Sequence, residues 1–440
     1  MKAYLGQTLQ RECHDTGLFC GAPMNFLVAD LPKRVSPDVS LTPVERVAQT
    51  TGELCAKHFG ASLRAVVLVG SLARDEGSIV ENDGLLNFVS DAEFILILRD
   101  SLPIPRAADV ANLTRMIEAQ LALQSIRCHI ALGYSHCQYL REMLPHIFAY
   151  EMKATGRVVF GETDVISLIP KFVPSDIPME DAWRLLSNRM IETAEVLAEI
   201  SGHAVGPVPP LVVYRVIKLY LDMATSLLLF LGEYAPSYRQ RSENLAALSA
   251  SDEGLEMVPF PLGPFSKMVN VCTGVKLSPT ALPEAFANWN WVADACQFAS
   301  DLWIWELGRI TGAREGTSPT ELCLRAIRQQ PLAARLRGWF YALRHRGWHR
   351  SARQWPRWIS LARTASPRYW LYAATGEVFL RPEMLLMGHS DKFAAPSDCH
   401  MLSNYLPLIP PSSSPAVRDR QTLLRAIAWN YHEFLEGTRG

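Results

Sequence analysis

The sequence predicts an α+β protein with a mixed β-sheet core, a helical second domain and a helical C-terminal region rich in arginine and tryptophan. Three observations support this prediction. Short β-branched runs alternate with helical periods up to about residue 174, which is typical of a mixed α/β unit. From residue 175 onward, apolar residues recur at the spacing of helices. Arginine and tryptophan are interleaved throughout residues 314–370.

The predicted core begins with a helix and a strand. Thr42 is the expected N-cap, with Glu45 at the third helical position, and the helix is expected to end near His58. Residues 64–69, RAVVLV, are short, β-branched and bounded by glycine. This run predicts a buried strand.

Two further strands and a helix complete the predicted core. The strands are expected at residues 92–98 (AEFILIL) and 127–132. The helix is expected between them, over residues 107–123. Asp91 and Glu93 stand two residues apart where the strand over 92–98 begins. Because side chains alternate along a strand, the two carboxylates are predicted to share one face.

The remaining chain is predicted to be helical. Helical periods are found at residues 179–200, 209–231, 239–250, 283–309 and 421–435. The run over 211–231 has the length of a membrane span. However, Arg215, Lys218 and Asp222 recur at intervals of three and four and therefore share one helix face. This pattern predicts a buried amphipathic helix, and no transmembrane segment is expected.

The region over residues 314–370 has an unusual charge pattern. It contains twelve arginines against two acids, Glu315 and Glu321, with five interleaved tryptophans. Arginine with aromatic residues is typical of surfaces that bind nucleic acid or anionic lipid. The alternative is an ordinary helical face whose arginines pair with acids elsewhere in the chain. All three interpretations remain open at this point.

Composition limits the classes of function. The 43 basic and 44 acidic residues give a net charge of −1, so no overall field steers the protein toward nucleic acid or membranes. Nine scattered cysteines without a Cys-x-x-Cys pair indicate reduced thiols. The N-terminus lacks the apolar run of a secretory signal, so a cytoplasmic protein is expected. The predicted segments are an N-terminal extension (1–40), the mixed core (41–174), a helical domain (175–312) and the Arg/Trp-rich region (313–440).

The residues that indicate chemistry lie between the end of the first predicted strand and the first residues of the second. Gly70 and Ser71 follow the first strand directly, where backbone N–H groups at a helix start can hold phosphates. Asp91 and Glu93 supply hard oxygen ligands of the kind that Mg²⁺ prefers. Together these four residues predict a site for a nucleoside triphosphate and its metal ion.

This stretch resembles the polymerase-β-like nucleotidyltransferase superfamily. The matching residues are Gly70, Ser71, Asp91 and Glu93, and the form GSLARDE with Arg74 is similar to that of stand-alone bacterial members. The resemblance implies a nucleotidyltransferase-like catalytic core at 41–174 that moves a nucleoside monophosphate from an NTP, with ATP expected, to an acceptor and releases pyrophosphate. It implies that Asp91 and Glu93 are catalytic and bind Mg²⁺, while Gly70, Ser71 and Arg74 contact the nucleotide.

Two later stretches are also similar to family features. Residues 145–166 resemble the segment that closes such cores, and residues 214–241 resemble the appended helical domain. In the family, a basic side chain from this domain commonly reaches the triphosphate. The resemblance makes Lys218 the candidate for this contact.

The third metal-binding carboxylate of the family has no match in the expected strand. That strand reads RCHIALGYSHC, with His129 at the most suitable position. Three alternatives follow: Glu76, Asp83 or Glu151 completes the site, His129 acts as general base, or the site binds nucleotide without turnover. The last alternative describes a catalytically degenerate nucleotide-binding or scaffold protein that docks a partner or membrane through the Arg/Trp-rich region.

A zinc site is the competing interpretation of the same strand. Two thiolates and two imidazoles can bind zinc tetrahedrally, and the segment contains Cys128, His129, His136 and Cys137. Adjacent strand residues point to opposite faces. The sequence therefore argues against convergence of these four groups.

Overall fold

The computed structural model divides the chain into two compact units. Unit 1 contains the described residues up to 176 together with residues 274–279, and unit 2 contains the other described residues from 177 onward. The structure describes residues 41–100, 103–200, 206–251, 258–279, 283, 286–314, 316–347, 354–381, 385, 403–408 and 420–437. The predicted N-terminal extension over 1–40 lies outside these residues.

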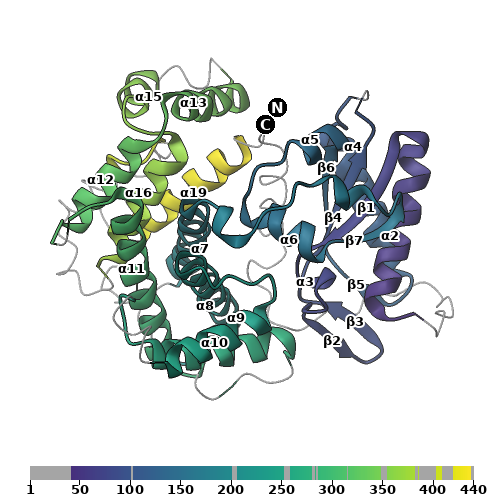
Figure 1. Cartoon of the computed structure of the whole chain (residues 1–440), viewed down its shortest axis with the longest axis horizontal. Coiled ribbons are helices and arrows are strands. Elements are labelled where there is room, and N and C mark those ends of the chain that lie inside the picture. The colour runs from purple at the N-terminus through teal and green to yellow at the C-terminus, as the bar shows by residue number, and fades with distance from the viewer. Residues whose placement is uncertain are drawn as a thin grey trace. The chain divides into compact units, whose positions relative to one another are not determined.

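Unit 1 is built on a four-stranded mixed sheet with the order β6-β4-β1-β7 (Figure 1). The strands are β1 (Leu63–Val69), β4 (Ala92–Leu98), β6 (Ile130–His136) and β7 (Arg157–Gly161). β1 pairs antiparallel with both β4 and β7, whereas β4 and β6 are parallel. The helices of this unit are α2 (Pro43–Phe59), α3 (Gly70–Ala73), α4 (Ala107–Ala122), α5 (Cys137–Arg141) and α6 (Ile147–Thr155). This architecture is α+β, as the sequence predicts.

Most predicted elements of the core are confirmed. Helix α2 begins at Pro43 with the expected capping box, in which the Thr42 hydroxyl accepts from the Glu45 N–H and the Glu45 carboxylate accepts from the Thr42 N–H. β4 has the predicted bounds. The third strand was predicted over 127–132, but β6 runs from Ile130 to His136. His129 therefore lies just before β6 rather than within it.

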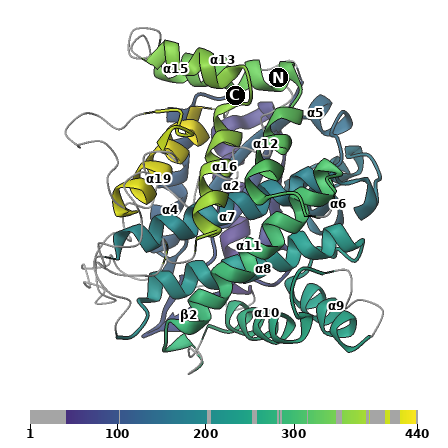
Figure 2. The same ribbon diagram turned by 90° about the vertical axis from the view of Figure 1, so that its left-hand side faces the viewer.

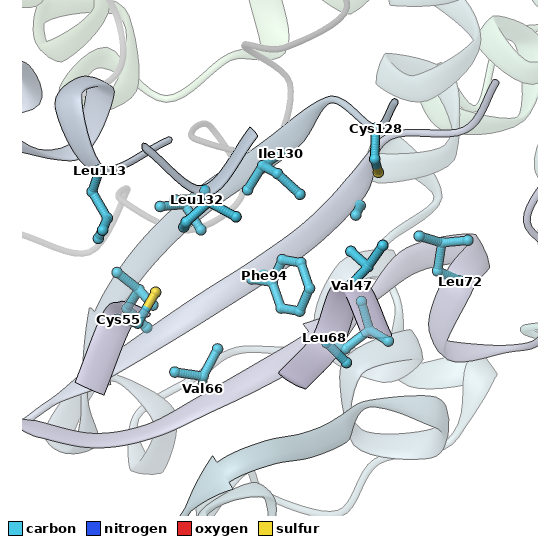
Figure 3. Packing of buried hydrophobic residues seen from close by; sticks show 14 of the residues in the cluster. Val47, Cys55, Val66, Leu68, Leu72, Phe94, Leu113, Cys128, Ile130 and Leu132 are labelled. Atoms are coloured by element: carbon cyan, nitrogen blue, oxygen red, sulfur yellow. The ribbon is translucent and has the colours of Figure 1, made fainter. Parts of the chain in front are cut away.

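The core of unit 1 fills the space between the sheet and its helices on both faces. On one face, alternate residues of β1, β4 and β6, including Val66, Phe94 and Leu132, pack with α2 and α4 (Figure 3). On the other face, Val67, Ile95 and their neighbours pack with α5 and α6. Burial on both faces explains why these strands read as continuous apolar runs in the sequence.

A second, small sheet lies in the segment that links the first two predicted strands. It has the order β2-β3-β5, with β2 (Ile79–Asn82) and β3 (Leu85–Phe88) forming a hairpin and β5 (Ile126–Arg127) parallel to β3. The hairpin turns at Asp83 and Gly84, which both have positive φ. This hairpin accounts for the long spacing between Ser71 and Asp91.

Unit 2 is helical and contains its own core (Figures 1 and 2). Its helices are α7 (Met179–Glu199), α8 (Pro210–Leu231), α9 (Tyr238–Ala250), α10 (Leu262–Leu277, with its last turn in unit 1), α11 (Asn290–Thr311), α12 (Pro319–Gln329), α13 (Leu332–Arg346), α15 (Trp355–Ala362), α16 (Pro367–Phe379) and α19 (Arg420–Gly437). The described residues of the predicted helical domain over 175–312 and of the Arg/Trp-rich region over 313–440 fall in this unit, apart from residues 175–176 and 274–279.

Helix α8 is confirmed as a buried helix, but its charged stripe is buried as well. Arg215 and Asp222 are 9% and 8% exposed. Both form ion pairs with α7: Arg215 with Glu192 at 2.9 Å and Asp222 with Arg189 at 2.6 Å. In the described part of the chain, no helix combines the length and apolar character needed to cross a bilayer.

The tryptophans of the Arg/Trp-rich region mostly belong to the core of unit 2. Trp339, Trp358 and Trp370 are 6–7% exposed. Each donates its indole N–H to a backbone carbonyl, at 2.8 Å, 2.9 Å and 3.0 Å respectively. Trp355 is 36% exposed, and Trp348 lies outside the described residues. The three buried rings therefore cannot serve as a platform for stacked bases.

Candidate functional site

The turn at the end of β1 is packed against a carboxylate. Gly70 has φ +69°, and a Cβ added to it would lie 2.4 Å from Oε2 of Glu93. Glu93 is opposite Val69 in the β1–β4 register. Only glycine fits here, because an added methyl group would overlap the carboxylate and the positive φ is unfavourable for other residues. The structure therefore brings Gly70, Ser71 and Glu93 together.

Asp91 immediately precedes β4 and is held there by bonds on both sides. The N–H of Ala92 donates to the carbonyl of His129 at 2.9 Å. On the other side, the Ser90 hydroxyl accepts from the Ser78 N–H at 2.8 Å and contacts Lys276 Nζ at 2.6 Å. These bonds fix the backbone of the Asp91–Glu93 segment relative to β6.

Lys276 is a buried cation next to this segment. It is 8% exposed and belongs to the last turn of α10, within the stretch of residues 274–280 that is part of unit 1. Besides the contact of Nζ with Ser90, its carbonyl accepts from the Ser78 hydroxyl at 2.5 Å. The bonds among Ser78, Ser90 and Lys276 form a closed set at the base of the β2–β3 hairpin.

Arg74 is engaged by two acids. Its Nε lies 3.1 Å from Glu76 and its Nη1 lies 2.9 Å from Glu151, and the Arg74 and Glu76 side chains are only 5–6% exposed. These ion pairs tie the segment after α3 to α6. The role of Arg74 as a nucleotide contact stays a prediction.

His129 forms a pair with a carboxylate that the sequence analysis did not single out. Its Nδ1 lies 2.9 Å from Glu118 Oε1, which also accepts from the N–H of Ile130 at 3.0 Å. Burial raises the pKa of Glu118, but the hydrogen bonds from His129 and Ile130 outweigh it, so this pKa lies below its usual value. A carboxylate at one ring nitrogen fixes the orientation and tautomer of an imidazole.

The three acids considered as a third metal ligand lie at different places. Glu76 and Glu151 contact Arg74, and Asp83 is exposed at the tip of the β2–β3 hairpin. The β6 residue in register with Glu93 is Ala131. Among the residues that the structure describes, no group of three or more His, Cys, Asp and Glu side chains is arranged to hold a metal ion.

The cysteines considered for zinc lie on opposite sides of the sheet. Cys128 belongs to the cluster that contains Phe94, and Cys137 to the cluster that contains Ile95. Both are buried free thiols.

Lys218 belongs to unit 2. It is half-buried on α8, with its Nζ 4.8 Å from the centre of the Tyr214 ring. The contact of Lys218 with the triphosphate stays a prediction.

Sequence reasoning missed Glu118 and Lys276. Glu118 follows Ile117, a buried position of α4, so its place beside His129 depends on how α4 packs on the sheet. Lys276 is 186 residues away from Ser90 along the chain. The one local signal is a lysine in the last turn of a helix, which also occurs on ordinary surfaces.

Comparisons with known proteins give one similarity. No protein-family model matches the chain, and no curated protein matches it. Among solved structures, the chain is similar to a spectinomycin adenyltransferase from Enterococcus faecialis determined with ATP and spectinomycin, at 14% identity and a TM-score of 0.36. The match covers 58% of this chain and 98% of that chain. Similarity at this level supports no conclusion about activity.

Proposed function

We propose that unit 1 is the catalytic core of a Mg²⁺-dependent nucleotidyltransferase. The observation that supports this most directly is the carboxylate of Glu93 against Gly70, at the turn where β1 ends and α3 begins. A metal-binding carboxylate is then next to backbone N–H groups suited to phosphates. In the proposed reaction, an acceptor hydroxyl, amine or phosphate attacks the α-phosphate of an NTP, and the bond to the β-phosphate breaks. Pyrophosphate leaves.

The donor set of the segment fits Mg²⁺. This ion is usually held by one or two carboxylates together with substrate phosphates, so Asp91 and Glu93 suffice without a third protein ligand. When bound, Mg²⁺ neutralises charge on the phosphates during transfer. The Gly70–Ser71 backbone would hold the β- and γ-phosphates, and Lys218 is the candidate cation for the departing pyrophosphate.

His129 is the proposed acceptor of the proton from the attacking group. Its ring is bound to Glu118 through Nδ1, and its carbonyl is bonded to the N–H that follows Asp91. The first contact supports a fixed imidazole, and the second holds the His129 backbone next to the start of β4. Glu118 is a positioning residue in this proposal because it acts through His129.

The first experiment is calorimetric titration of the protein with each NTP and Mg²⁺, with pyrophosphate release followed in the same samples. The wild type is expected to bind an NTP, with ATP the first choice, only when Mg²⁺ is present, and to release pyrophosphate. Asp91→Asn is expected to abolish release while leaving the circular dichroism spectrum unchanged. Turnover by Asp91→Asn at the wild-type rate would refute the assignment.

Asp83→Asn provides a matched control. Asp83 is exposed at the hairpin tip with φ +50°, a conformation that asparagine tolerates as well as aspartate. The same change of charge there is expected to leave both binding and release as in the wild type. Loss of activity in this control would instead make Asp83 part of the site.

The second candidate function is nucleotide binding without transfer. It is favoured by Ala131, which occupies the β6 position in register with Glu93 and offers no third carboxylate. This candidate predicts Mg²⁺-dependent binding of NTP with no pyrophosphate release in the presence of hydroxyl, amine or phosphate acceptors. Absence of any NTP binding would reject both functions.

A further inference from the structure

Two neighbouring helices of unit 2 carry apolar side chains on their outer surfaces. On α13, Leu332, Leu336 and Phe340 follow one another at intervals of four and are 58%, 54% and 58% exposed. On α15, Trp355 and Ile359 have the same spacing and are 36% and 58% exposed. Residues four apart lie on one side of a helix, so each helix presents an apolar stripe. We call these five residues the α13–α15 face.

The inner surfaces of the same two helices hold them in place. Trp339 and Trp358 lie with ring centres 5.4 Å apart, and each ring lies about 6 Å from Phe434 of α19. Figures 1 and 2 both show α13 and α15 side by side. The buried tryptophans therefore hold α13 and α15 against each other and against α19. Exposed apolar side chains gathered on adjacent helices mark an interaction surface.

The charge of this segment selects the kind of partner. Between residues 332 and 363 the chain contains no Asp or Glu and eight arginines, at 335, 337, 344, 346, 350, 353, 357 and 363. Arg337 and Arg344 are exposed on α13. A second copy of this chain would bring the exposed Arg337 and Arg344 of both copies together, so charge complementarity favours an anionic partner.

The apolar residues of the α13–α15 face indicate which class of anionic partner it binds. Nucleic acid binding through stacking requires a row of exposed aromatic rings. Trp339, Trp358 and Trp370 are buried, and the face has one exposed ring on each helix, Phe340 on α13 and Trp355 on α15. The exposed side chains are mainly aliphatic, and they favour contact with acyl chains. Aliphatic stripes flanked by arginine are typical of helices that lie at a bilayer interface, where arginine stems extend toward lipid phosphates.

We propose that the α13–α15 face binds the surface of membranes that contain anionic phospholipid. The test is co-sedimentation of the full chain with vesicles of phosphatidylcholine alone or of equal parts phosphatidylcholine and phosphatidylserine. Binding is expected to be at least about tenfold tighter with phosphatidylserine and to weaken as salt is raised. Equal or undetectable binding to both vesicle types would overturn the proposal.

Two double variants locate the surface. Leu336→Glu with Phe340→Glu is expected to weaken binding to the mixed vesicles at least about tenfold. The matched control is Met116→Glu with Leu144→Glu, since these side chains are 56% and 69% exposed in unit 1. This control is expected to bind as the wild type does. An equal loss in the control would show a general charge effect and reject the assignment.

A charge variant keeps the test valid if the acidic variant does not fold. Arg337→Gln with Arg344→Gln leaves the apolar stripe in place and is expected to reduce the preference for phosphatidylserine severalfold. Two other results would overturn the proposal. One is a dimer that Leu336→Glu separates, and the other is binding of a labelled oligonucleotide that requires this face while vesicles do not bind.

Discussion

Gly70 combines a positive φ with a close carboxylate, so a side chain at this position is strained. Gly70→Ala adds a Cβ 2.4 Å from Glu93 Oε2 at φ +69°. It is expected to lower the free energy of unfolding by about 1–3 kcal/mol and to weaken Mg²⁺-dependent NTP binding. Gly308→Ala is the matched control, because Gly308 lies within α11 with no atom within 4 Å of an added Cβ. That variant is expected to gain about 0.5–1 kcal/mol. Urea unfolding of both variants checks the prediction.

Glu306 on α11 is a fully buried carboxyl group with no cation among its described partners. It accepts a hydrogen bond from the Ser226 hydroxyl, and Oε2 has no hydrogen-bond partner among the described residues. Burial raises the pKa of Glu306 to about 8, from 4.5 in an exposed glutamate, although the bond from Ser226 acts to lower it. Between about pH 4.5 and about pH 8, Glu306 is therefore protonated in the folded state and ionised in the unfolded state.

The expected consequence is a loss of stability as the pH rises through this window. The contribution of Glu306 is fully present below about pH 4.5 and is lost by about pH 8, with a slope of up to about 1.4 kcal/mol per pH unit. Glu306→Gln should remove this slope in denaturant titrations at several pH values. Glu321→Gln on the exposed surface of α12 is the control. An unchanged slope in Glu306→Gln would contradict the prediction.

At the scale of elements, α7 and α8 are joined by buried charges as well as by apolar packing. Arg189 contacts Glu192 and Asp222, and Glu192 also contacts Arg215. Glu192→Gln takes away the carboxylate that contacts both arginines, so it is expected to cost about 3–5 kcal/mol of unfolding free energy. The control is Glu180→Gln, whose pair with Arg184 is 41–47% exposed and worth about 0–1 kcal/mol. Equal costs for the two variants would refute this.

The elements of unit 1 also show what the sequence could predict. Local signals were sufficient to predict α2, whose capping box is formed by Thr42 and Glu45. They were also sufficient to predict β4, whose apolar run begins at Ala92 and ends at Leu98 as the strand does. The β2–β3 hairpin was missed although its Asp83–Gly84 turn is a known signal, because its strands are short and only partly buried. α10 was missed because its glycines and Pro264 resemble a loop.

The candidate site could be predicted only where its residues are close in the sequence. Gly70, Ser71, Asp91 and Glu93 lie in one stretch, and the structure brings the Gly70 turn and Glu93 together. The contacts of Glu118 and Lys276 depend on the packing of helices from elsewhere in the chain. The same limit applies to the charged stripe of α8, since periodicity gives the shared face but not the acids and bases of α7 that cover it.

At the scale of the whole molecule, the Arg/Trp-rich region cannot be removed from the helical unit without exposing its core. Trp183 of α7 contacts Tyr369 and Tyr372 of α16, with ring centres 5.4 Å and 5.3 Å apart. The Tyr372 hydroxyl donates to Asn188 at 2.8 Å, and His432 of α19 contacts Glu195 at 2.7 Å. Both α16 and α19 therefore complete the core around α7.

Truncation of the chain after residue 312 tests this dependence. Hydrogen exchange of α7 amides is expected to accelerate by orders of magnitude, because the apolar side chains that protect α7 become exposed. The amides of β1 and β4 are expected to keep their protection, since they belong to unit 1. Protection of α7 that is unchanged by truncation would contradict the prediction.

The return of residues 274–280 to unit 1 has a consequence for biosynthesis. Residues up to 176 leave the ribosome about 100 residues before Lys276 does, which corresponds to a delay of roughly 5–20 s. During this interval Ser78 and Ser90 lack the lysine that contacts them in the finished fold. The Asp91–Glu93 segment therefore acquires its final support only after residues 177–273 of unit 2 have been synthesised, so a nascent chain cannot complete this part of the fold early.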